Sequence, residues 1–166
     1  MIRTLSLLAV ALFSSFTIQA ATWEDVATRF GCTNKVHASE QAGGSQYIME
    51  FVPQGQKLGA QERMFTITLV RTSQAEAEAN QHIDQVIKSM AGVTGRSGAK
   101  VFEFNSYKSN HGPTAYFEFV LKGEYNVGVI QRVGPGIIAI QQLATFNGRT
   151  PNNSDRAAVK AMLGAN

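Results

Sequence analysis

Residues 114–133, TAYFEFVLKGEYNVGVIQRV, contain the pattern that decides the fold. Every second residue from 115 to 121 is apolar, which is the repeat of a β-strand whose alternate side chains share one face. Gly123 interrupts this pattern, and a second strand is expected over residues 125–133. Because the connection is so short, we predict an antiparallel hairpin with a tight turn near Lys122-Gly123-Glu124.

The same reasoning extends outward from the hairpin. Alternating apolar residues predict further strands over 46–52, 63–71, 100–107 and 137–146. Short helices are expected over 23–30 and after a cap at Ser154, and a longer helix is expected from a capping box at Ser73 to Gly92. Residues 37–45, which end in glycine and serine, are predicted to form a flexible loop. The expected order is therefore α-β-β-α-β-β-β-β-α, with about six strands in a mostly antiparallel sheet.

Several of these strands are apolar on both faces. In the central strand, Tyr116 and Val120 alternate with Phe117 and Phe119. A sheet with one face in water would alternate apolar and polar residues more cleanly. We therefore predict an α+β fold in which helices cover both faces, giving a three-layer α/β/α sandwich.

The first twenty residues have the features of a signal peptide. Arg3 precedes a short apolar run, Leu5–Phe13, and small residues for cleavage follow near Ala20. That run is too short to span a bilayer, although an N-terminal membrane anchor is the alternative. We predict a signal peptide at 1–20 and a single globular domain at 21–166. The domain is expected to be exported, periplasmic or secreted, with no stable membrane insertion after cleavage.

Charge and cysteine content exclude several classes of protein. The net charge is +3 for the whole chain, and it falls to +2 when Arg3 leaves with the signal. No cluster of lysine and arginine is present, so a nucleic-acid partner is not expected. Cys32 is the only cysteine, which rules out a disulfide within the chain. This free thiol could be buried, reactive, or bridged to another chain in an oxidising compartment.

The sequence contains no recognisable catalytic or metal-binding motif. His37, His82 and His111 do not have the spacing of zinc ligands, and no cofactor is predicted. Cys32 and His37 are close in sequence and could form a thiol and its base, but such pairs are normally assembled from distant segments. The sequence thus favours a protein that is not an enzyme.

One group of residues could form a binding surface. Aromatic residues with polar tips are placed in the middle strands, together with two cations: Tyr107, Tyr116 and Tyr125 beside Lys122 and Arg132. Gly128, inside a predicted strand, suggests a bulge or a close approach of another chain segment.

Residues 47–56, YIMEFVPQGQ, lead into the strand MFTITL at 64–69. This stretch, with the order of elements given above, resembles the Mog1/PsbP-like α/β/α sandwiches, which include small exported bacterial proteins of the DcrB type. The resemblance implies the sandwich fold and an accessory or binding role, without a specific site.

We therefore expect an exported, non-catalytic binding or accessory protein of the bacterial envelope or secretome, whose protein or small-molecule partner is unknown. One alternative is a structural or assembly partner, such as a homodimer formed through Cys32 or a sheet edge. The other is a small hydrolase whose residues converge only in the folded chain.

Overall fold

The computed structural model describes residues 22–40, 46–71, 85, 98–109, 112–134 and 136–163. The predicted signal peptide and the helix expected from Ser73 lie outside these residues, apart from Gln85, which is helical. The described elements are α2 (Trp23–Thr28), β1 (Asn34–Glu40), β2 (Gln46–Val52), β3 (Arg63–Arg71), β4 (Lys100–Ser109), β5 (Gly112–Leu121), β6 (Glu124–Gly134), β7 (Ile137–Thr145) and α4 (Asn153–Ala161). None of the helices in this part of the chain is long and apolar enough to cross a membrane.

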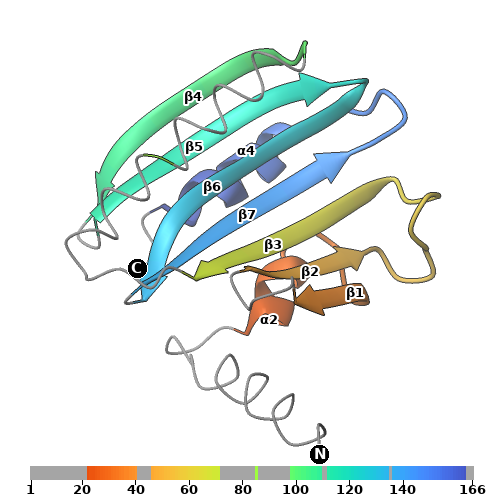
Figure 1. Ribbon diagram of the computed structural model, residues 1–166. Helices are drawn as coiled ribbons and strands as arrows, with labels where there is room; N and C mark the ends of the chain where they lie inside the picture. The colour runs from red at the N-terminus through yellow and green to blue at the C-terminus, as the bar shows by residue number, and fades with distance from the viewer. Residues whose placement is uncertain are drawn as a thin grey trace, which may run out of the picture.

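All the described strands belong to one antiparallel sheet with the order β1-β2-β3-β7-β6-β5-β4 (Figure 1). Strands β4 to β7 form the predicted meander, and the β5–β6 hairpin turns at Lys122 and Gly123. Their φ angles of 52° and 80° are both positive, as the primed turns that match the twist of a hairpin require. Strand β3 pairs with β7 on the side away from β6. Strands β2 and β1 follow β3 and complete the sheet.

The sheet contains seven described strands where about six were expected. The additional strand is β1, most of which was predicted to be a loop. Its sequence, NKVHASE, lacks an apolar alternation because β1 is an edge strand that is largely exposed. It is held by backbone pairing to β2, with a bulge between Lys35 and His37. Apolar periodicity could not detect a strand whose side chains stay mostly in water.

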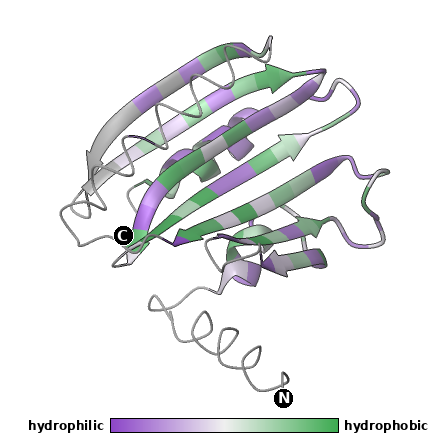
Figure 2. Cartoon of the chain, viewed as in Figure 1, coloured by the Kyte–Doolittle hydropathy of each residue, from purple (hydrophilic) through white to green (hydrophobic). Residues whose placement is uncertain are grey.

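Both faces of the sheet carry buried apolar side chains. Figure 2 shows hydrophobic positions interspersed with hydrophilic ones along the strands. On one face, which we call the helix-covered face, α2 and α4 pack on residues that include Phe65, Tyr116, Val127 and Leu143. The buried residues of the opposite face are Ala115, Phe117, Phe119, Ile130 and Ile138. The described helices thus supply one of the two helical layers that were predicted.

Both described helices begin with a capping box, and in α4 the cap is not the predicted residue. Thr22 caps α2, and its side chain forms a reciprocal capping box with Asp25. In α4 the cap is Asn152 rather than the predicted Ser154. The Asn152 side-chain oxygen accepts the Asp155 N–H at 2.7 Å, while the Asp155 carboxylate accepts the Asn152 N–H. This box satisfies two N–H groups at the start of the helix.

Candidate binding surface

Tyr116, predicted to line a concave surface, is instead fully buried beneath α4. Its side chain has no exposed area, and its hydroxyl donates to Glu118 at 3.2 Å. The ammonium group of Lys160 lies 4.6 Å from the centre of the Tyr116 ring. Burial, followed by the neighbouring Glu118 charge, raises the pKa of the Tyr116 hydroxyl. Tyr116 is thus a core residue with a satisfied polar tip, and not a contact residue for a ligand.

The other predicted residues do not form one surface. Tyr125 lies on the helix-covered face, and Lys122 is exposed in the adjoining turn. Arg132 pairs in register with Ile138, which belongs to the opposite face. Tyr107 pairs with Thr114 at the far end of β4, and its side chain is outside the described part of the structure. Tyr125 and Lys122 lie at one end of the sheet, whereas Tyr107 and Arg132 lie at the other.

The structure adds Phe102, which is not among the five predicted residues. Phe102 is 47% exposed, and its ring stacks on Tyr125 with centroids 6.1 Å apart and an interplanar angle of 9°. The cause is a bulge between Val101 and Glu103, which inserts an extra residue into β4 at Phe102. A bulge of this kind re-aims side chains, and a simple repeat of two cannot reveal it.

One cation contacts this aromatic pair, and a second lies in the adjoining turn. The Lys100 ammonium group lies 5.1 Å from the centre of the Phe102 ring, within the range of a cation–π interaction. Lys122 is exposed in the β5–β6 turn, next to the start of β6 where Tyr125 lies. We call Lys100, Phe102, Lys122 and Tyr125 the aromatic–lysine surface. It offers an apolar platform with positive charge at its rim, which suits an apolar group that carries or adjoins an anion.

Beside this surface, ion pairs hold α4 to strands β5 and β4. Arg156 binds the Glu118 carboxylate at 2.6 Å, and Lys160 lies 3.3 Å from Glu103. The hydrogen bonds from Arg156 hold the pKa of Glu118 below its ordinary value, although burial opposes the effect. Each acid in this group has a basic partner, so the cluster fixes the position of α4.

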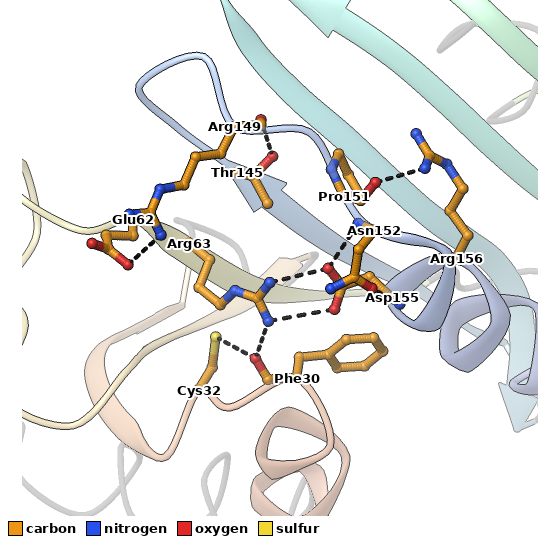
Figure 3. Close-up of polar contacts among 10 residues, drawn as sticks. All are labelled: Phe30, Cys32, Glu62, Arg63, Thr145, Arg149, Pro151, Asn152, Asp155 and Arg156. Carbon is orange, nitrogen blue, oxygen red and sulfur yellow. Dashed lines mark hydrogen bonds and ion pairs between the residues drawn. The ribbon is translucent and has the colours of Figure 1, made fainter.

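A second polar cluster joins the two described helices through β3 (Figure 3). Arg63 donates to both carboxylate oxygens of Asp155 in α4, and also to the backbone oxygen of Phe30 after α2. The Cys32 thiol lies 3.7 Å from the same Phe30 oxygen. Arg63 therefore ties the C-terminal end of α2 to the start of α4.

Cys32 is a buried thiol rather than a reactive one. It is fully buried in the core of the helix-covered face, where desolvation raises its pKa to about 11. His37, considered as a possible base for it, is exposed on β1 and bonds to Ser39 at 2.9 Å. The described residues therefore do not form the thiol–histidine pair. They also contain no cluster of three potential metal ligands.

Comparison with protein families and with curated protein sequences finds no match. Among solved structures, the chain is similar to the solution structure of cyanobacterial PsbP (CyanoP) from Synechocystis sp. PCC 6803. The two share 8% sequence identity with a TM-score of 0.36, over 88% of this chain and 93% of the other. What the chain shares with that protein is a weak likeness in fold.

Proposed function

We propose that this protein is an exported, non-catalytic accessory protein that binds a partner protein through the aromatic–lysine surface. The observation that carries the proposal is the exposed Phe102 ring, stacked on Tyr125 and flanked by Lys100. Aromatic side chains that are partly exposed and held rigidly are typical centres of protein interfaces, because they bury a large area at a small entropic cost.

The position of Phe102 on the sheet strengthens this proposal. Its backbone is fixed by pairing to β5, and its ring is fixed by the Tyr125 ring, which comes from the strand beyond. Phe102 therefore does not need to be ordered when a partner binds, which lowers the cost of association. Val101, next to it in β4, is 42% exposed and adds an apolar side chain on the opposite face of the sheet.

The proposed export rests on the N-terminal sequence, where a charged residue, a short apolar run and small residues follow one another. Residues 47–56 and 64–69 resemble DcrB-type envelope proteins, which would suit the same location. The partner is accordingly expected in the periplasm or outside the cell.

Capture of a partner by cross-linking in the envelope fraction of the native host tests this function. The bait is the mature chain, compared with Phe102→Ser and Leu58→Ser. Leu58 is a matched control because it is also 47% exposed, but lies in the loop between β2 and β3. The proposal predicts that Phe102→Ser loses the captured protein and Leu58→Ser retains it. Equal capture by both variants would refute it.

A further inference from the structure

Strand β4 ends the sheet, and this edge adjoins the aromatic–lysine surface. Within the described residues, β4 pairs with β5 alone. An edge strand presents a row of backbone N–H and C=O groups that can pair with another extended chain. Addition of a strand to such an edge is a recurring way of binding a segment of a partner protein.

The first residues of β4 make this edge apolar toward both faces of the sheet. Val101 pairs in register with Phe119 of the opposite face, whereas Phe102 stacks on Tyr125 of the helix-covered face. Both are exposed large apolar residues. A strand added beside them would gain side-chain contacts above and below the sheet, which pairing of backbone groups alone would not provide.

The positive charge at this edge favours an acidic binding partner. Lys100 begins β4, and Lys122 is exposed in the adjacent turn. Glu103 is the acidic residue of β4, and it already forms an ion pair with Lys160. A second copy of this chain would bring the same lysines to the edge, where like charges oppose pairing, whereas acidic side chains would be attracted.

We infer that β4 is the docking edge for an extended, acidic segment of the partner protein, with apolar residues that pack on Val101 and Phe102 and carboxylates that meet Lys100 and Lys122. This inference rests on the proposed function and specifies its partner. The segment would pair with β4 and become the eighth strand of the sheet.

Short peptides of alternating valine and threonine, with two aspartates or two lysines at their ends, test the inference. Titration into the mature chain, followed by calorimetry and by amide NMR shifts of β4, is expected to give binding of the aspartate peptide at least about tenfold tighter than that of the lysine peptide. Lys100→Glu should remove this preference, and Phe102→Ser should weaken both peptides. Since Lys100 and Phe102 are exposed, both variants are expected to fold, which circular dichroism checks.

Equal binding of the two peptides, or no binding of either, would overturn the inference. Dimerisation that is abolished by Phe102→Ser would also overturn it, by identifying a second copy as the occupant. If the peptides fail while Phe102→Ser still abolishes capture of the envelope partner, the surface functions as proposed and only the strand addition is wrong.

Discussion

Gly128 lies in the middle of β6, at a point where the sheet leaves no room for a methyl group. A Cβ atom built there would collide with the backbone oxygen of Gln141 and with the ring of Phe117. The sequence predicted a bulge or a close approach at this glycine, and the close approach is confirmed. The residue is required by packing, because its own φ angle is not in the left-handed region.

We predict that Gly128→Ala lowers the free energy of unfolding by about 3 kcal/mol, because a backbone oxygen cannot move aside cheaply. The comparison is Gly148→Ala, which has open space around it but a φ of 73°. That substitution should cost about 1 kcal/mol through backbone strain alone. Denaturant unfolding of both variants measures the difference, and equal losses would show that the collision at Gly128 is relieved.

The chemistry of Cys32 provides a second test at this scale. Because the thiol is buried and its pKa is raised to about 11, very little thiolate forms near neutral pH. We predict that a thiol reagent labels native Cys32 at pH 8 at least about a hundredfold more slowly than the unfolded chain. Rapid labelling of the native protein, or a dimer that a reductant dissociates, would contradict the buried position.

At the scale of the elements, α4 depends on charged groups as much as on apolar ones. Glu118 and Arg156 have side chains that are 9% and 31% exposed, respectively, whereas Glu62 and Arg149 are 47% and 61% exposed. An ion pair that is mostly buried leaves an unsatisfied charge when one partner is removed, but an exposed pair contributes little. The two pairs therefore form a matched comparison.

We predict that Glu118→Gln costs about 2 kcal/mol of stability at neutral pH, and Glu62→Gln less than about 0.5 kcal/mol. The folded-state pKa of Glu118 is lowered from 4.5, so its contribution is complete above that value and is lost as the pH falls through the folded pKa. The stability difference between wild type and Glu118→Gln should accordingly be constant near neutrality and shrink below pH 4.5. A difference that does not change with pH would refute the role of the charge.

The start of α4 allows a test of which residue caps the helix, Asn152 as in the structure or Ser154 as the sequence predicts. Asn152→Ala should cost about 1 kcal/mol, because it removes the acceptor for the Asp155 N–H. Ser154→Ala should change stability very little, since Ser154 is exposed in the first turn. Thermal unfolding of both variants checks this, and the reverse order would restore Ser154 as the cap.

The elements illustrate what the sequence can and cannot predict. Strands β2, β3 and β5 to β7 lie close to where their apolar residues predict them, because their side chains are buried on at least one face. Strand β1 escaped prediction because an edge strand is held by backbone hydrogen bonds. The binding surface escaped prediction in part because the bulge at Phe102 interrupts the repeat of two in β4, and because Tyr116 is covered by a helix distant in sequence.

At the scale of the whole molecule, the sheet has a different character at its two edges. The β1 edge is polar, whereas the β4 edge begins with Val101 and Phe102 exposed and adjoins the Tyr125 ring. On the helix-covered face, Arg63 bonds to α4 and to the turn that follows α2. A rigid platform of this kind can present one aromatic edge without rearranging on binding.

Amide hydrogen exchange of the chain with and without its captured partner tests the binding surface most directly. The account predicts that binding raises protection in residues 100–105 of β4 and 124–126 of β6, and leaves the β2–β3 loop at residues 54–62 unchanged. Protection confined to that loop or to β1, with β4 unaffected, would contradict it.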